Sequence, residues 1–268
     1  MLAGNTGTAV GAPRGLAWPQ LPARAGGAWR AWTRLVALRR SVSDACRALG
    51  RNGTALDEAA WLRSRAFALS RLSGAICAAN GLRVAISGPI PAGPVVLVAN
   101  HVGYLDPLVL ASIVPCVPVA KRELATWPLI GRAARQHGVL FVDRGTVASG
   151  AAALRGARRA LRASLSVLNF PEGTTTRGDR VLPFRRGIFG LARLADVPVV
   201  PAALVLEDEA LSWVGDDLLL PHLARTLARP EHAVRVRFGR ALIPRRYGSA
   251  DDLAREAHDV VEHLLGEA

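Results

Sequence analysis

The 268-residue sequence contains no long hydrophobic run. No segment reaches the ~18 to 20 apolar residues that a helix needs to cross a bilayer. The uncharged stretch 107–120 is shorter and contains three prolines. The first residues also lack an unbroken apolar region before a small-residue cleavage site, so a secretory signal is not indicated. We therefore expect a peripheral protein without a transmembrane span.

Cysteine and lysine are also scarce. Cys46, Cys77 and Cys116 are odd in number and lack metal-ligand spacing, which indicates reduced cysteines in a cytoplasmic environment. Lys121 is the only lysine, yet 34 basic residues against 21 acidic ones give a formal net charge of +13. This excess predicts an anionic partner. Because neither a basic recognition helix nor an interleaved aromatic platform is present, we expect an anionic membrane surface and no nucleic acid.

Residues 1–82 are predicted to form an N-terminal region of their own. Residues 1 to about 25 are rich in glycine, alanine and proline and are expected to be mobile. A helix is predicted over 28–49. A second helix is predicted from a cap at Thr54 to Asn80, because Asp57 and Glu58 suit a first helical turn. The two helices would form a helical hairpin.

Four of the six tryptophans lie in this region, namely Trp18, Trp29, Trp32 and Trp61. Tryptophan beside arginine is typical of a helix on a membrane surface, where the ring lies at headgroup depth and the guanidinium reaches water. A helix packed on its own domain explains the pattern equally well.

From residue 83 onwards, short apolar runs alternate with helical segments. This alternation predicts an α/β fold with a mainly parallel central sheet flanked by helices. Active sites in such sheets gather at the carboxyl ends of the strands. The predicted strands are near 95–99, 117–120, 139–142, 165–170, 199–206 and 234–238. The predicted helices are 107–113, 127–136, 147–163 and 188–195, and residues 207–231 are expected to be an insertion.

The first buried strand leads directly into Asn100-His101, and Asp106 follows five residues later. Pro107 suits a first helical turn, so we expect Asp106 to be the helix cap, close enough to accept a hydrogen bond from the imidazole of His101. Such a carboxylate fixes the tautomer and leaves the other ring nitrogen free to take a proton. The pair therefore indicates a general base, although the same spacing also arises by chance.

A second loop, Phe170-Pro171-Glu172-Gly173-Thr174, also follows an apolar run. Gly173 permits close backbone approach, and Glu172 could orient hydroxyl groups or a neighbouring base. The backbone N–H groups of Gly173 and Thr174 could hold an anion. Taken alone, the loop is equally consistent with a turn that carries a surface acid.

The two motifs, in this order and about 70 residues apart, resemble the glycerophospholipid acyltransferase family, which includes the 1-acylglycerol-3-phosphate acyltransferases. The segments 138–144 and 197–201 are similar to two further blocks of that family. The resemblance covers about residues 83 to 243, and it implies an acyltransferase catalytic domain over 83–268.

The resemblance also implies roles for individual residues. His101 would activate an acceptor hydroxyl for direct attack on an acyl thioester, with Asp106 as its partner. Acceptor-binding roles are implied for Gly138, Arg144, Glu172, Gly173, Thr174, Arg177 and Pro201. Neither a metal nor a cofactor is implied, and acyl-CoA or acyl carrier protein would serve as co-substrate at the cytoplasmic face of the cell membrane.

The acceptor is expected to be a lysophospholipid such as 1-acylglycerol-3-phosphate. Many family members that use this acceptor have arginine after Glu-Gly-Thr, whereas this chain has Thr175. The departure favours other lysolipids, including lyso-ornithine lipid, as the alternative. A lipid hydrolase and a non-catalytic membrane-binding protein are the competing classes, and the absence of a Gly-x-Ser-x-Gly elbow after any strand argues against the hydrolase.

Overall fold

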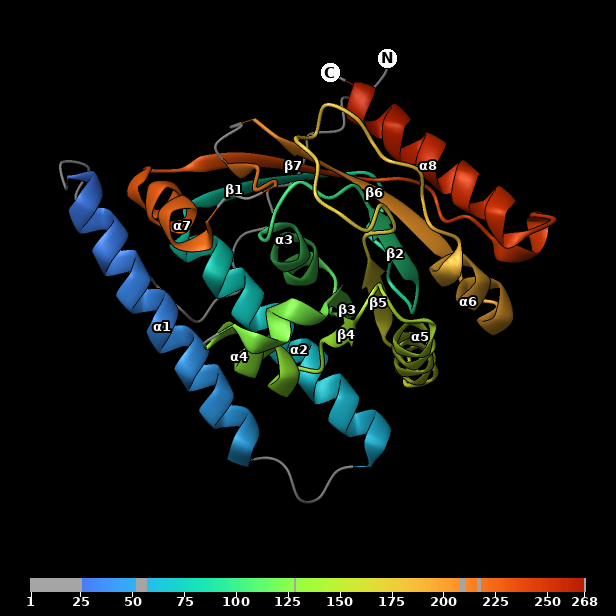
Figure 1. Cartoon of the computed structure of the whole chain (residues 1–268), viewed down its shortest axis with the longest axis horizontal. Helices are drawn as coiled ribbons and strands as arrows, with labels where there is room; N and C mark the ends of the chain where they lie inside the picture. Colours follow the sequence, from blue (N-terminus) through green and yellow to red (C-terminus); the bar gives the residue numbers. More distant parts are fainter. Residues whose placement is uncertain (1–25, 52–56, 128, 208–210, 216–217, 268) are drawn as a thin grey trace, which may run out of the picture.

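The computed structural model describes residues 26–51, 57–127, 129–207, 211–215 and 218–267. The segment 1–25, predicted to be mobile, and the predicted cap Thr54 lie outside these residues. Two long helices, α1 (Gly27–Arg51) and α2 (Glu58–Ala79), pack against each other and confirm the predicted hairpin (Figure 1). Asp57 caps α2 by accepting a hydrogen bond from the backbone N–H of Ala60 at 2.6 Å. Among the described helices, none is long and apolar enough to cross a bilayer.

Seven strands of the described chain form one sheet in the order β1-β7-β6-β2-β5-β3-β4. Neighbouring described strands are parallel except β6 and β7, which are antiparallel. The predicted α/β fold with a mainly parallel sheet is therefore confirmed. The strands are β1 (Leu82–Ser87), β2 (Val96–Ala99), β3 (Cys116–Lys121), β4 (Leu140–Val142), β5 (Ser166–Asn169), β6 (Val199–Leu206) and β7 (His232–Phe238).

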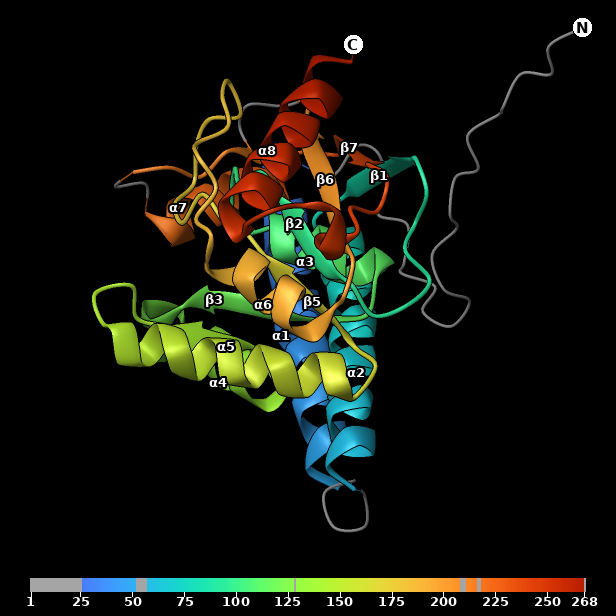
Figure 2. The ribbon, with the colours of Figure 1, turned by 90° about the vertical axis from the view of Figure 1, so that its right-hand side faces the viewer.

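The central strand β2 is buried on both faces, because its side chains point alternately into two cores. Leu97 and Ala99 pack in one core with α2 and α3 (Asp106–Ile113), whereas Val96 and Val98 pack in the other. The second core is covered by α5 (Val147–Arg162), α6 (Gly187–Ala195) and α8 (Ala250–Gly266). These three helices face the viewer in Figure 2. The strand ends near His101 thus lie between two packed layers.

Several elements differ from the predicted ones. The helix predicted over 127–136 begins only at Ile130, as α4 (Ile130–Gln136), after the 3₁₀ helix η1 (Arg122–Thr126). Trp127 is extended because it precedes Pro128, and a residue before proline is disfavoured in helical conformation. The predicted insertion contains α7 (Leu219–Ala228), and β1, α8 and the 3₁₀ helix η3 (Pro244–Arg246) were not predicted.

The basic stripe of α1 has a structural role that the sequence did not suggest. The guanidinium of Arg34 donates hydrogen bonds to the carbonyls of Leu227, Arg229 and Pro230 at 2.6–3.2 Å, and Arg30 donates to Ala228 at 2.8 Å. The last carbonyls of a helix have no partner within the helix, and positive charge there is favourable. The hairpin is therefore fastened to the carboxyl end of α7.

Candidate active site

The carboxyl ends of β2, β5, β3 and β4 meet at one edge of the sheet, because these strands are mutually parallel. His101 follows β2, Phe170 follows β5, and Arg144 follows β4. These strand ends thus carry two of the predicted site residues, His101 and Arg144, together with Phe170.

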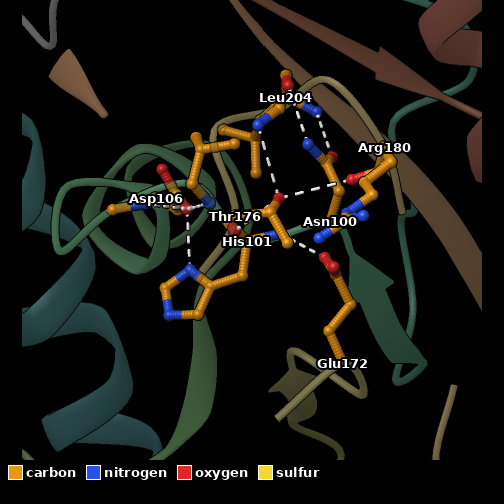
Figure 3. A network of polar contacts seen from close by, with 10 residues as sticks. Asn100, His101, Asp106, Glu172, Thr176, Arg180 and Leu204 are labelled. Carbon is orange, nitrogen blue, oxygen red and sulfur yellow. Dashed lines mark hydrogen bonds and ion pairs between the residues drawn. The ribbon is translucent and has the colours of Figure 1, made fainter. Parts of the chain in front are cut away.

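His101 and Asp106 form the predicted contact. The Nδ1 atom of His101 lies 2.7 Å from Oδ2 of Asp106, which is 2% exposed. The same oxygen accepts hydrogen bonds from the backbone N–H groups of Val102 at 2.6 Å and Gly103 at 2.8 Å. Figure 3 shows the ring held by Nδ1, and no bond to Nε2 is found among the described residues. Nε2 can therefore accept a proton.

Asp106 is not the helix cap that the sequence suggested. It is the first residue of α3, and Leu105 occupies the cap position without a side-chain hydrogen bond. The carboxylate turns back to the loop before the helix because three donors converge on it there. The contact with His101 is unchanged by this one-residue shift.

Glu172 holds the backbone of the same loop. Its Oε1 accepts from the N–H of His101 at 2.7 Å (Figure 3), and its Oε2 accepts from the N–H of Leu182 at 2.9 Å. Burial raises the pKa of this carboxyl, and the two amide hydrogen bonds oppose that change. Both oxygens are thus engaged by main chain, and Glu172 orients the base through its backbone.

The loop between β2 and α3, residues 100–105, is called the catalytic loop below, and Asn100 links it to β6. Its Nδ2 donates to the carbonyl of Leu204 at 3.0 Å, and its Oδ1 accepts from the N–H of Leu204 at 2.8 Å (Figure 3). An amide side chain carries both a donor and an acceptor and can imitate a backbone pair. This residue belongs to the recognised motif, but its partner 104 positions away could not be inferred from the spacing.

The ring of His101 stacks on Phe170, with 4.2 Å between ring centroids and 19° between planes. Both residues line a cavity of about 970 Å³ whose lining is mainly apolar. One part of the lining comes from the hairpin, with Leu38 and Val42 of α1 and Leu72 of α2. A cavity of this size and character can take flexible hydrocarbon.

Two arginines from the loops after β4 and β5, namely Arg144 and Arg185, also line this cavity, and Arg39 of α1 lines it too. Partial burial and the charge of Arg185 lower the pKa of Arg144, whereas the carboxylate of Glu123 opposes that change. Neither guanidinium forms an ion pair with a carboxylate of the described chain. Two guanidinium groups that influence each other favour an anion between them. Arg185 was a neighbour of the motif in sequence but was not predicted as a site residue.

The remaining predicted substrate residues divide into two groups. Gly173 and Thr174 line the cavity, and Gly173 has φ +79°, with the Arg185 side chain so close that a Cβ would lie 2.9 Å from its Nε. The N–H of Gly173 donates to the carbonyl of Phe170 at 3.2 Å, so it is already engaged in a turn. The second group, outside the described lining, consists of Gly138, Glu172, Arg177 and Pro201.

Each member of that second group has a different location. Gly138 follows α4 with φ +80°, and Arg177 is exposed to solvent. Pro201 is buried inside β6 opposite Val98. Its carbonyl accepts from the N–H of Gly239 at 2.8 Å. Direct acceptor contact for these residues stays a prediction.

An aromatic cluster beside the base was not predicted. Tyr104 contacts Trp213 edge to face at 5.9 Å between centroids, and Trp213 contacts Trp127 in the same way at 6.0 Å. The tyrosine hydroxyl lies 3.2 Å from Nδ1 of His222 in α7. Trp213 and His222 stood out in the sequence only as residues of the predicted insertion. Their contact with the catalytic loop could not be predicted, because it forms only in the folded chain.

The fold and the site define an α/β enzyme with a histidine–aspartate base at the carboxyl edge of a mainly parallel sheet, beside a large apolar cavity. Residues 82–205 match the Acyltransferase family model. The chain belongs to this acyltransferase family, which confirms the resemblance found in the sequence.

Named relatives support this membership. The chain is 35% identical over 197 residues to the lyso-ornithine lipid O-acyltransferase of Pseudomonas aeruginosa, covering 71% of this chain and 75% of the relative. It is 38% identical over 130 residues to human 1-acyl-sn-glycerol-3-phosphate acyltransferase alpha, covering 46% of each.

The solved structure of the 1-acyl-sn-glycerophosphate acyltransferase PlsC from Thermotoga maritima has the same fold. The TM-score is 0.63 at 20% sequence identity, with 89% of this chain and 97% of that chain covered. The likeness includes most of the described elements and supports the α/β assignment.

Proposed function

We propose that this acyltransferase moves a fatty acyl group from a thioester to a free hydroxyl of a lysolipid. The observation that carries the proposal is the His101–Asp106 pair at 2.7 Å on the wall of the large apolar cavity. Family membership supplies the class of reaction, and the lysolipid acceptors named for the relatives supply the class of substrate.

The proposed reaction is a direct transfer. Asp106 holds the Nδ1 proton of His101, so Nε2 takes the proton of the acceptor hydroxyl. The hydroxyl oxygen attacks the thioester carbonyl carbon and forms the new ester bond. The carbon–sulfur bond then breaks, and the proton on Nε2 passes to the departing thiolate. A positioned histidine of this kind contributes about 10² to 10⁴ in rate.

Arg144 and Arg185 are proposed to bind the anionic group of the acceptor, because both line the cavity that also contains His101. Guanidinium groups suit carboxylates and phosphates equally, so they do not identify the headgroup. Thr174 also lines the cavity, and its backbone N–H is proposed as a further donor for that anion or for the developing oxyanion.

Lyso-ornithine lipid is the acceptor that we favour. Three relatives with this name match 31–35% of aligned residues over about 70% of this chain. Thr175, which lines the cavity, replaces the arginine expected after Glu-Gly-Thr in many enzymes that use 1-acylglycerol-3-phosphate. The acyl donor is proposed to be acyl-CoA or acyl carrier protein.

We further propose a peripheral location on the anionic, cytoplasmic surface of the cell membrane. Trp29 and Trp32 of α1 are 58% and 61% exposed, and the chain carries a formal charge of +13. Exposed tryptophans beside arginines suit the membrane interface, where lipid substrates are available.

The test is acyl transfer by the purified full chain. Lyso-ornithine lipid and 1-acylglycerol-3-phosphate are supplied together in detergent with either donor type, and the diacyl products are measured by mass spectrometry. Transfer should fall at least a hundredfold in His101→Ala while the circular dichroism spectrum is retained. Full activity in that variant would refute the assigned base, and release of free fatty acid at a matching rate without acceptor would indicate a hydrolase.

A further inference from the structure

Residues 211–215, between β6 and α7, contribute one wall of the cavity beside the base. The backbone N–H of Trp213 donates to the carbonyl of Val102 at 2.9 Å, one residue beyond His101. The Trp213 ring lies between those of Tyr104 and Trp127, and all three side chains line the cavity. Edge-to-face rings held in this way make a stiff wall.

A buried histidine fastens that wall to the catalytic loop. Nε2 of His222 lies 3.0 Å from the carbonyl of Ser212, which can only accept, so Nε2 carries a proton. In the neutral ring, Nδ1 then accepts from the hydroxyl of Tyr104 at 3.2 Å. His222 is 2% exposed. His222 of α7 thus holds the catalytic loop through Tyr104. It also holds Trp213 through the neighbouring residue Ser212.

The aromatic wall borders the charged part of the cavity. Trp127 directly follows the 3₁₀ helix η1, which contains Glu123. Glu123 also lines the cavity; it lies 3.5 Å from the ammonium group of Lys121 and acts electrostatically on Arg144. The ring faces of the aromatic wall attract an ammonium group, whereas Arg144 and Arg185 attract an anion. The cavity therefore offers complementary surroundings for a headgroup that carries both charges.

We propose that Trp213, with Trp127, forms an acceptor-selective wall that favours a headgroup bearing a positively charged amine, and that the Tyr104–His222 hydrogen bond positions this wall. The proposal rests on the proposed lysolipid acyltransferase function. Trp213 contacts the acceptor headgroup, while Tyr104 and His222 act through Trp213 and are positioning residues.

The experiment compares two acceptors in the same detergent, lyso-ornithine lipid, which has an amine, and 1-acylglycerol-3-phosphate, which has none. Trp213→Leu should raise the KM for lyso-ornithine lipid about tenfold and leave its kcat and the KM of the acyl donor within about twofold. Catalytic efficiency with 1-acylglycerol-3-phosphate should change less than about threefold. Trp213→Phe keeps a ring and should restore most of the preference.

The role of the Tyr104–His222 hydrogen bond is tested by removing each partner in turn, with the second tyrosine of the chain as a control. Tyr104→Phe removes the hydroxyl and should shift the acceptor preference in the same direction as Trp213→Leu, by about threefold. In a double-mutant cycle the effects of His222→Phe and Tyr104→Phe should be less than additive, because both remove the Tyr104–His222 bond, although His222→Phe also removes the bond to Ser212. Tyr247→Phe is the matched control, since Tyr247 does not line the cavity. Phe67→Leu, at an exposed position of α2, is the control for loss of an aromatic ring.

Three outcomes overturn the proposal. Equal losses for the two acceptors in Trp213→Leu would mean that the wall is not selective, and unchanged kinetics would mean that it does not touch the acceptor. A wild-type enzyme that uses only 1-acylglycerol-3-phosphate would refute the amine preference while leaving acyl transfer intact. If the wild-type enzyme acylates neither lysolipid, the proposed function itself fails, and this appears before any variant is compared.

Discussion

The two sides of the cavity are built differently. On the side of the base, the carboxylates of Asp106 and Glu172 are at most 4% exposed and bind backbone N–H groups at 2.6–2.9 Å. On the headgroup side, Arg144 and Arg185 are exposed and have no carboxylate partner within the described chain. Buried groups bound to main chain have fixed geometry, whereas exposed cations keep their hydrogen-bonding capacity for a ligand. The fold thus fixes the position of the catalytic base, whereas solvent-facing arginines are available to bind the charge of the headgroup.

The largest effect should come from Asp106→Asn. The carbonyl oxygen of asparagine can take the place of Oδ2, which accepts all three hydrogen bonds, but it carries no negative charge to stabilise the imidazolium of His101, so kcat should fall about 10³-fold at neutral pH. Steady-state acyl transfer measures the loss. Asp251→Asn, in an exposed ion pair with Arg186 and outside the cavity lining, is the matched control and should retain activity. A folded Asp106→Asn enzyme with near wild-type kcat would contradict the division between the two sides.

Glu172→Gln tests whether the second buried carboxylate acts through the backbone. The glutamine has one carbonyl oxygen for two N–H donors, so one amide loses its partner, and stability should fall by about 1–3 kcal/mol. We expect kcat to fall about tenfold because the backbone of His101 is less well held, while acceptor KM changes little. Urea unfolding and kinetics give the two values. A raised acceptor KM with unchanged stability would instead assign Glu172 to substrate binding.

The same variant has a pH signature. Burial raises the pKa of Glu172, so the folded state holds its proton more tightly than the unfolded state does. The contribution of this carboxyl to stability is therefore fully present below its ordinary pKa and declines as pH rises through the raised value. Glu172→Gln should remove this decline, and urea unfolding between about pH 4 and 7 checks it. An unchanged pH dependence in the variant would contradict the shift.

How much of this site the sequence predicts depends on how local each contact is. The His101–Asp106 bond spans five residues and followed from the motif, as did the strand before it. The bond between Glu172 and the His101 amide spans 71 residues and forms only because β2 and β5 are adjacent in the sheet. A motif can indicate that a carboxylate is needed, but not that its partners are backbone groups.

The helices and strand that were not predicted differ in how clearly the sequence indicates them. In α8, Leu253, Ala257, Val261 and Leu264 recur at helical spacing and are buried, so that helix was predictable from periodicity. In β1, Leu82, Val84 and Ile86 alternate with more exposed residues, which is the strand period. By contrast, α7 is held by Arg30 and Arg34 across separations of 193 to 198 residues, and no local pattern records that contact.

Arg144→Gln tests the exposed side. Removing one guanidinium should raise the acceptor KM about tenfold and leave kcat within about twofold, because the base is untouched. The matched control is Arg158→Gln, at an exposed position of α5 outside the cavity lining, which has the same charge change. A loss confined to kcat would assign Arg144 a catalytic role. It would then contradict the division of the cavity into a buried catalytic side and an exposed headgroup-binding side.

The smallest effect on catalysis should come from Trp29→Ala with Trp32→Ala. Both rings are on the exposed part of α1 and do not line the cavity, so activity on detergent-solubilised lysolipid should change less than about twofold. Binding to vesicles that contain anionic lipid should weaken about fivefold, because the interfacial rings are lost while the net charge is kept. Vesicle flotation measures this loss, and Leu194→Ala, which removes exposed apolar surface from α6 on the opposite face, should bind normally. Equal vesicle binding by the wild type, the double tryptophan variant and Leu194→Ala would show that the tryptophans of α1 do not bind lipid. The exposed side chains with a role in recognition would then be those at the headgroup end of the cavity.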